Sequence, residues 1–161
     1  MKLKKIILGM ALLSSGAVMV GCNNGEVEQS LVKEDLNMDE VKLNLLESGL
    51  LEESTFQSVA KDHWIFESVK DVIEDGFVTQ AMINVKLQDV FFIKTTDVDA
   101  VEKAILEYKE NSLRTFGDGY GGEDNITAVA NSKLVKMGEY VYFIATKNAD
   151  EVEAKLLELI K

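Results

Sequence analysis

Hydrophobic and polar positions divide the chain into three parts. An apolar run from Ile6 to Val20 is interrupted only by small residues, and a polar, acidic stretch over 22–36 follows it without sustained periodicity. From residue 37 onward, segments with a hydrophobic period of 3.6 alternate with segments of period two. The pattern predicts a flexible acidic tether over 22–36 and a single folded domain over 37–161, which is long enough for one core.

Three segments of the domain have the apolar spacing of amphipathic helices. They cover residues 37–48, 97–116 and 148–160. Asn37 and Asn148 each precede a glutamate by three residues, which is the capping-box pattern that begins a helix. A shorter helix is predicted over 67–76 with Gly76 at its C-terminus, although the pattern leaves the fold of residues 50–76 open.

Four segments have the pattern or composition of β-strands. They cover residues 81–87, 90–95, 133–137 and 140–146. Gly138 and Glu139 separate the last two, and this pair suits the tight turn of a β-hairpin. After an N-terminal helical region the order is strand, strand, helix, strand, strand, helix. This order predicts an α+β fold, an antiparallel sheet of about four strands with helices packed on one face.

The start of the chain has the layout of a secretory signal. Three lysines within residues 2–5 precede the apolar run, which ends in Met-Val-Gly-Cys over residues 19–22. This tetrapeptide resembles the lipobox of bacterial lipoproteins, in which the cysteine receives diacylglycerol before the signal peptide is removed. We therefore expect a signal peptide over 1–21 and a lipid anchor on Cys22, at the outer face of the cytoplasmic membrane. A spanning helix is disfavoured because the run is shorter than about 20 residues and lacks a basic flank after it.

Charge narrows the classes of partner. The chain has a net charge of −11, and removal of residues 1–21, which hold three lysines and no acids, leaves −14. Such a surface repels phosphate backbones and anionic lipid headgroups, so nucleic-acid binding is disfavoured and membrane attachment requires the covalent anchor. Cys22 is the only cysteine, and its acylation leaves no thiol for a disulfide or for catalysis.

The glycine-rich segment GDGYGGEDN, residues 117–125, contains the most suggestive polar cluster. Its oxygen-bearing side chains belong to Asp118, Glu123, Asp124 and Asn125. Calcium prefers such ligands, but the spacing of a calcium-binding loop is absent, so we interpret the segment as a solvated loop and keep a cation site as the alternative. A phosphate cradle is disfavoured because no Lys-Ser/Thr pair follows the glycines. No cofactor is predicted.

Other candidate groups favour structural roles. His63 is the only histidine, and one histidine without free cysteines cannot form a zinc site. No serine lies in a recognisable nucleophile elbow. We expect His63, next to Trp64, to be a packing or surface residue rather than a general base. The alternation of the strand aromatics predicts that they belong to the core: Phe91, Phe92, Tyr140, Tyr142 and Phe143.

Much of the domain resembles domain-of-unknown-function family 4358. The resemblance rests on INVKLQDVFFIKTTDVDAVEKAILEYKENSLRTF, GYG and KMGEYVYFIATKNADEVEAKLLELIK, within about residues 65–161. The shared features are a strand that leads into an acidic helix start, a long helix that ends in an aromatic residue and glycine, and a hairpin with Gly-x-Tyr. Residues 38–64 do not match. The family occurs mainly on lipoproteins of Gram-positive Clostridia and relatives, which implies an exported, anchored α+β domain and assigns no catalytic residues.

Two functions follow as hypotheses. The first is a lipid-anchored, non-enzymatic module that binds an envelope protein or a small ligand. The second is an exported hydrolase or metal-assisted enzyme that uses the acidic loop 117–125 and His63. A two-domain clamp that delivers a ligand to a transporter is disfavoured, because the mature chain has length for one core only.

Overall fold

A five-stranded antiparallel sheet forms the centre of the domain in the computed structural model, which describes residues 32–52 and 55–161. The strand order is β1-β2-β3-β5-β4. The strands are β1 (Thr55–Val59), β2 (Ile73–Ala81), β3 (Asp89–Thr95), β4 (Lys133–Met137) and β5 (Tyr140–Ala145). The helices are α1 (Met38–Glu47), α2 (Val98–Asn111), α3 (Arg114–Gly117), α4 (Glu123–Ala130) and α5 (Ala149–Ile160). Three short 3₁₀ helices follow β1: η1 (Ala60–Asp62), η2 (Trp64–Phe66) and η3 (Lys70–Val72). The predicted α+β class and antiparallel sheet are confirmed.

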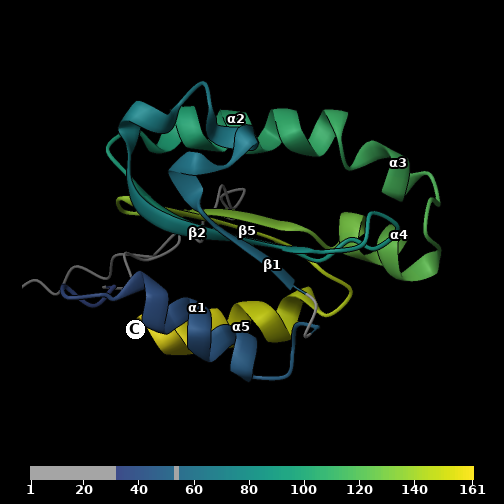
Figure 1. The fold of residues 1–161 in the computed structure, drawn as a ribbon, viewed down its shortest axis with the longest axis horizontal. Coiled ribbons are helices and arrows are strands. Elements are labelled where there is room, and N and C mark those ends of the chain that lie inside the picture. Colours follow the sequence, from purple (N-terminus) through teal and green to yellow (C-terminus); the bar gives the residue numbers. More distant parts are fainter. Residues whose placement is uncertain (1–31, 53–54) are drawn as a thin grey trace, which may run out of the picture.

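Helices cover both faces of the sheet, so the expectation of helices on one face was wrong. Figure 1 shows α2 on one side of the strands and α1 with α5 on the other. The cause lies in the central strands, where neighbouring residues point to opposite faces and both are apolar. Phe91 belongs to the core under α2, whereas Phe92 belongs to the core under α1 and α5. A strand that is apolar at every position needs cover on both faces.

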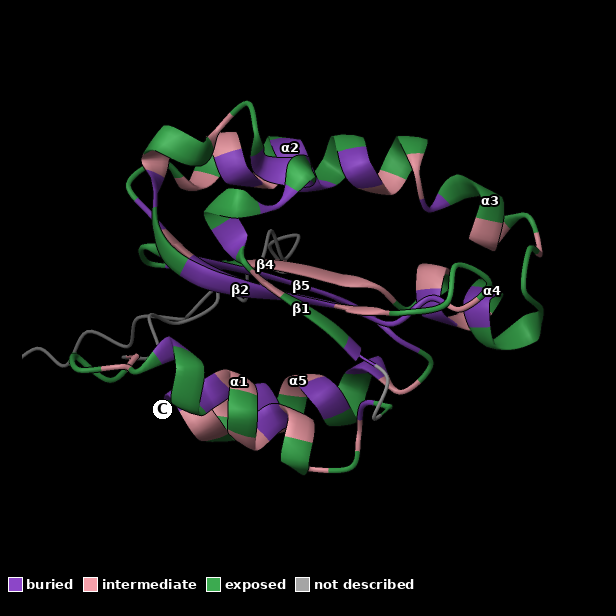
Figure 2. Ribbon diagram, viewed as in Figure 1, coloured by how far each residue is buried: buried purple, intermediate pink, exposed green. Residues whose placement is uncertain are grey.

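The two cores are closed by the apolar stripes of the helices. Ile105 of α2 is fully buried in one core, and Leu45 of α1 and Leu156 of α5 are fully buried in the other. In Figure 2 buried positions alternate with exposed ones along α1, α2 and α5, the three helices that cover the sheet. All five strand aromatics that the alternation assigned to the core are buried.

The first predicted strand pair differs from the structure in its first member. The expected strand over 81–87 is a connection between β2 and β3, in which Ile83 and Val85 are exposed. The strand lies earlier, over Ile73–Ala81, and takes in the end of the helix expected over 67–76. Pairing with β1 on one side and β3 on the other fixes β2 in this position, and local periodicity cannot reveal such partners.

The helix expected over 97–116 is interrupted, and one helix was missed. Asp97 begins α2, as its side chain accepts a hydrogen bond from the Ala100 amide at 3.0 Å, but α2 ends at Asn111 and α3 is a separate turn. Part of the segment interpreted as a loop over 117–125 belongs to α4. Gly122 followed by Glu123 and an acidic first turn is a helix-start pattern that the sequence does contain.

The described part of the chain begins beside the C-terminal end of α5. The Lys33 amide donates a hydrogen bond to the Ile160 carbonyl at 3.0 Å, and Val32 and Leu36 pack against the core under α1 and α5. Of the expected tether, only residues 32–36 are described, and the expected signal peptide and Cys22 lie outside the described residues. Among the helices that the structure describes, none is long and apolar enough to cross a membrane.

Gly76 holds a position in β2 that no side chain fits. Its φ angle is +142°, next to an irregularity in the β2–β3 register between Ile73 and Asp75. A Cβ atom there would lie 2.5 Å from the Phe92 carbonyl oxygen and 2.9 Å from the Ile93 Cα. The close approach of two backbones, rather than the end of a helix, explains this glycine.

We expect Gly76→Ala to lower the free energy of unfolding by about 3 kcal/mol or more, because the strained φ and the backbone clash add. Gly138→Ala is the matched control, since Gly138 also has a positive φ, +62°, but open space around its Cα. It should cost only about 1 kcal/mol. Urea unfolding measures both, and equal losses would contradict the steric explanation.

Candidate functional site

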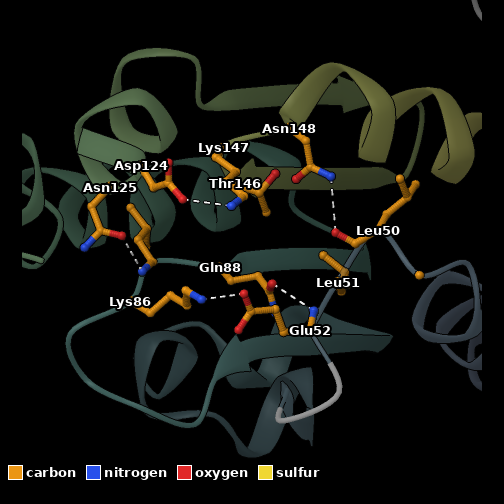
Figure 3. A pocket seen from close by; sticks show the side chains of 12 residues that line it. Leu50, Leu51, Glu52, Lys86, Gln88, Asp124, Asn125, Thr146, Lys147 and Asn148 are labelled. Atoms are coloured by element: carbon orange, nitrogen blue, oxygen red, sulfur yellow. Dashed lines mark hydrogen bonds and ion pairs between the residues drawn. The ribbon is translucent and has the colours of Figure 1, made fainter. Parts of the chain in front are cut away.

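Four separate segments meet at the end of the sheet where α5 begins. They are residues 49–52 after α1, 86–88 before β3, 124–125 in the first turn of α4, and 146–148 between β5 and α5. Together they line a cavity of about 670 Å³, the sheet-end cleft, shown in Figure 3. This volume lies within the range of about 300–1,000 Å³ that is usual for small-molecule sites.

Two ion pairs face each other across the sheet-end cleft. Lys86 Nζ bonds Glu52 Oε1, and Lys147 Nζ bonds Asp124 Oδ2 at 2.8 Å (Figure 3). The hydrogen bond and charge of Lys147 lower the pKa of Asp124, with a smaller effect from Lys86. Asp124 raises the pKa of Lys147, and Glu52 adds to this. The four charges therefore alternate in sign, interact across the cleft and sum to zero.

Asn125 holds one wall of the cleft in place. Its Oδ1 accepts a hydrogen bond from the Leu87 amide at 2.9 Å, and its Nδ2 donates to the carbonyls of Val85 at 2.9 Å and Tyr120 at 2.8 Å. A Cβ atom on Gly121 would clash with the Val85 carbonyl and the Asn125 amide. Gly121 thus allows the glycine-rich segment to pack closely against the connection between β2 and β3. The three hydrogen bonds of the Asn125 side chain hold the two segments together.

Hydrogen bonds of the Gln88 and Asn148 side chains order the opposite wall. Gln88 Oε1 accepts from the Glu52 amide at 2.9 Å, and Gln88 Nε2 donates to Thr55 Oγ1 at 2.7 Å. Asn148 Nδ2 donates to the Leu50 carbonyl at 3.2 Å. The side chain of Asn148 does not cap α5, so the predicted capping bond is absent there, whereas the predicted cap at Asn37 of α1 is present.

Thr146 lines the cleft and has a buried hydroxyl without a partner. The residue is only 2% exposed and lines the cavity, and its Oγ1 has no hydrogen-bond partner. Among the described residues only Ser58, which is not part of the lining, shares this property. A buried hydroxyl without a partner costs about 1–3 kcal/mol, so Thr146 is a position beside the cavity where the fold gives up stability.

The structure brings only two of the four candidate cation ligands to the cleft. Asp124 and Asn125 line it, whereas Asp118 Oδ2 lies 3.8 Å from Arg114 Nε and Glu123 is exposed to solvent. Within residues 32–52 and 55–161, no group of three or more His, Cys, Asp or Glu side chains is placed to hold a metal ion. The sequence analysis singled out Asp124 and Asn125 of the cleft. No pattern in the sequence indicated that residues 49–52 and 146–148 would lie beside them.

The comparison with known families agrees with the resemblance in the sequence. A family model described as a domain of unknown function (DUF4358) matches residues 65–146, about half of the chain. The chain belongs to this family. The match runs from η2 to the end of β5, so the DUF4358 part supplies residues 86–88 and 124–125 of the cleft, and residues 49–52 lie outside it. No curated protein and no solved structure matches the chain.

His63 of this DUF4358 protein lies in a buried polar network. Its Nε2 is 2.9 Å from Gln80 Oε1, and its Nδ1 accepts a long 3.4 Å hydrogen bond from the Ile65 amide. Gln80 Nε2 donates to Asp89 Oδ1 at 3.2 Å, and Tyr108 donates from its hydroxyl to Asp89 Oδ2 at 2.5 Å. The packing role expected for His63 fits its 5% exposure. The partners come from four elements, so no local pattern could reveal the network.

Burial controls the protonation of this network. Desolvation raises the pKa of Asp89 to about 7, against the opposing hydrogen bonds from Tyr108 and Gln80. Desolvation lowers the pKa of His63, which keeps the ring neutral at physiological pH. Asp89 is 3% exposed and is not part of the cleft lining, so this acid affects stability rather than ligand contact.

We expect the stability to depend on pH through Asp89. Its pKa is about 7 in the folded chain and about 3.9 when unfolded, so between these values the folded state binds the proton more tightly. The free energy of unfolding therefore falls, by a few kcal/mol, as pH rises from about 4 to 7. Asp89→Asn, which imitates the protonated acid, should lack this loss and gain on the wild type at pH 8 in urea unfolding. Asp118→Asn is the exposed control, and a parallel pH dependence of Asp89→Asn and wild type would contradict the prediction.

Proposed function

We propose that the protein is a lipid-anchored binding module, attached through diacylglycerol on Cys22 at the outer face of the cytoplasmic membrane, and that the sheet-end cleft binds a small polar ligand of the cell envelope. The observation that supports binding is the cleft itself. It combines two ion pairs and ordered amide side chains in a cavity of ligand size. Polar groups that converge in one cavity are typical of recognition sites.

The protonation of the cleft favours binding over acid–base catalysis. An acid–base catalyst needs a pKa near the working pH. The pKa of Asp124 is lowered and that of Lys147 is raised, each by the other, so both groups stay charged at neutral pH. Fixed charges recognise a ligand but do not exchange protons with it. Within residues 32–52 and 55–161, the one acid with a pKa near 7 is Asp89, which is buried outside the lining.

The position of the cleft suits a protein that is anchored by its N-terminus. The described chain begins at the C-terminal end of α5, where Lys33 bonds Ile160, and the cleft lies at the N-terminal end of the same helix (Figure 1). The helix has 12 residues, so about 18 Å separates the two ends. An anchor on Cys22 would therefore hold the domain with the cleft remote from the point where the chain enters it.

The charge of the protein supports a covalent anchor. Without residues 1–21 the chain has a net charge of −14, which repels the anionic headgroups of a membrane. The described domain accordingly offers no electrostatic route to the bilayer, and attachment depends on the lipid. The same charge disfavours nucleic acid as a partner.

We expect the wild-type chain to incorporate labelled fatty acid and to sediment with membranes, whereas Cys22→Ser should incorporate none and should fail to be processed at residue 22. Radiolabelling followed by membrane fractionation measures both. Cys22→Ser leaves every described residue unchanged, so its fold is not at issue. Label on Cys22→Ser, or none on the wild type, would overturn the anchor.

The binding role is tested by amide chemical shifts of the full-length chain in detergent micelles. The low-molecular-mass fraction of an envelope extract from the producing cells should shift the amides of residues 49–52, 86–88 and 146–148. Lys147→Ala should reduce these shifts. Lys155→Ala should not, because Lys155 is a partly exposed lysine of α5 that pairs with Glu158 outside the cleft. Shifts elsewhere only, or no shifts, would contradict the assignment of the cleft.

A further inference from the structure

A groove runs along one side of α2, apart from the sheet-end cleft. Two adjoining cavities of about 180 and 380 Å³ share Ala104 and Glu107 and together form this α2 groove. One side is the segment 64–69, which includes η2 and packs against α2. The other side is a single stripe of α2, with the spacing of three and four residues that places side chains on one helix face. It consists of Ala100, Lys103, Ala104, Glu107, Tyr108 and Asn111.

An exposed tryptophan stands at one end of the α2 groove. Trp64 is the only tryptophan of the sequence, and at 64% it is the most exposed aromatic side chain among residues 32–52 and 55–161. It lines the smaller of the two cavities. A single exposed apolar residue needs no explanation by itself. Trp64 differs from such a residue because its neighbours hold its ring beside a cavity.

Two buried rings hold Trp64 in place. The ring centroids of His63 and Tyr108 each lie 5.8 Å from that of Trp64, and Tyr108 meets it at an angle of 73°, in an edge contact. His63 and Tyr108 are themselves fixed, because His63 bonds Gln80 and the Tyr108 hydroxyl donates to Asp89. The buried polar network thus supports an exposed ring. A platform that is ordered before binding loses less conformational entropy when a ligand arrives.

The rest of the lining combines small apolar side chains with hydrogen-bonding groups. Ala100 and Ala104 contribute only methyl groups. Asn111, in the same cavity as the indole, offers an amide, and Glu107 offers a carboxylate that is 62% exposed. Lys103 pairs with Glu107 only loosely, at 3.9 Å, so both side chains remain accessible to a ligand. An aromatic ring with polar neighbours matches a ligand that has an apolar face and a polar rim.

A sugar has this shape and this charge. One face of a pyranose ring consists of C–H groups that pack on an indole, while the hydroxyls at its rim bond amides and carboxylates. Among the described lining residues, Lys103 and Glu107 are the only charged ones, and they sum to zero, which suits a neutral ligand. Nucleotides also stack on aromatic rings, but the net charge of −14 without residues 1–21 repels their phosphates.

We propose that the α2 groove binds a neutral oligosaccharide, with one sugar ring stacked on Trp64. The hydroxyls of this ring bond Asn111 and Glu107, and the adjoining cavity beside Ala100 receives the next sugar. The inference adds a second site to the proposed function and does not depend on the sheet-end cleft, with which the groove shares no lining residue. Sugars with and without acetamido groups share this chemistry, and the experiment separates them.

The test is the tryptophan fluorescence of the full-length chain in micelles of a detergent without a sugar headgroup. Trp64 is the only indole, so the emission reports on the groove directly. The probes are triacetylchitotriose and maltotriose, two neutral trisaccharides of which only the first carries acetamido groups. Stacking should displace water from the ring and shift the emission to shorter wavelength in a saturable way, whereas glycerol at equal mass concentration should not. The probe with the lower dissociation constant identifies the class of sugar.

Variants at exposed positions separate a sugar contact from a structural role, with amide chemical shifts as the measure of affinity. Trp64→Ala should weaken binding about tenfold or more, as the loss of a stacking ring usually does, and Trp64→Phe should weaken it less. Asn111→Ala should weaken it about fivefold, since one hydrogen bond is lost. Leu106→Ala removes an exposed apolar side chain of the same helix outside the groove and should leave the affinity unchanged. Lys147→Ala, in the sheet-end cleft, should also leave it unchanged.

Absence of an emission shift with both trisaccharides would overturn the proposal. Binding that Trp64→Ala leaves unchanged, or that Leu106→Ala weakens equally, would overturn it as well, because the sugar would then bind elsewhere. In each of these cases, amide shifts at the sheet-end cleft with the envelope extract would leave the proposed function intact. Conversely, sugar binding at Trp64 without any shift at the cleft would contradict only the assignment of the cleft.

Discussion

Burial of the sheet on both faces is the constraint on which the rest of the structure depends. In β3 the neighbouring residues Phe91 and Phe92 belong to different cores, and β5 repeats this with Tyr142 and Phe143. Each face must be covered by apolar helical stripes, because exposed aromatic surface is costly in water. The requirement places α2 on one side and brings α1 and α5, the two ends of the domain, together on the other (Figure 1). The domain thus needs its terminal helices as well as the DUF4358 part to close its core.

The position of the cleft follows from this arrangement. The end of α1 and the start of α5 lie at one end of the sheet, where Asn148 bonds the Leu50 carbonyl. The connection into β3 and the first turn of α4 reach the same place, and Asn125 joins them. At the start of β3, Gln88 lines the cleft, whereas the next residue, Asp89, belongs to the buried polar network of His63. Polar residues concentrate at this end of the sheet, where β3 begins and β5 ends, because the hydrophobic cover ends there.

Local sequence signals predicted the elements that depend on local physics. The helices at 37–48 and 148–160, most of α2 and the β4–β5 hairpin were predicted correctly, because each has a full apolar period and a start or turn residue such as Asn37 or Gly138. The strand expected over 81–87 was wrong, since its alternation was not supported by pairing partners. Gly76 was assigned to a helix end although it serves a backbone contact across β2 and β3. In the candidate site, the sequence analysis singled out Asp124 and Asn125 as ligands of a cation. In the structure Asp124 forms an ion pair with Lys147, and Asn125 bonds the connection before β3.

The sequence by itself determined the α+β class and the strong negative charge, and it predicts a single domain and an anchor on Cys22, because composition and short-range periodicity carry this information. The tertiary structure alone decided that both sheet faces are covered and that Glu52, Lys86, Asp124 and Lys147 form one ring of alternating charge. These residues are separated by 34, 38 and 23 positions along the chain. The packing of α1 and α5 against the sheet, together with the bonds of Asn125 to the connection before β3, brings them together. No local pattern encodes a contact that depends on the whole fold.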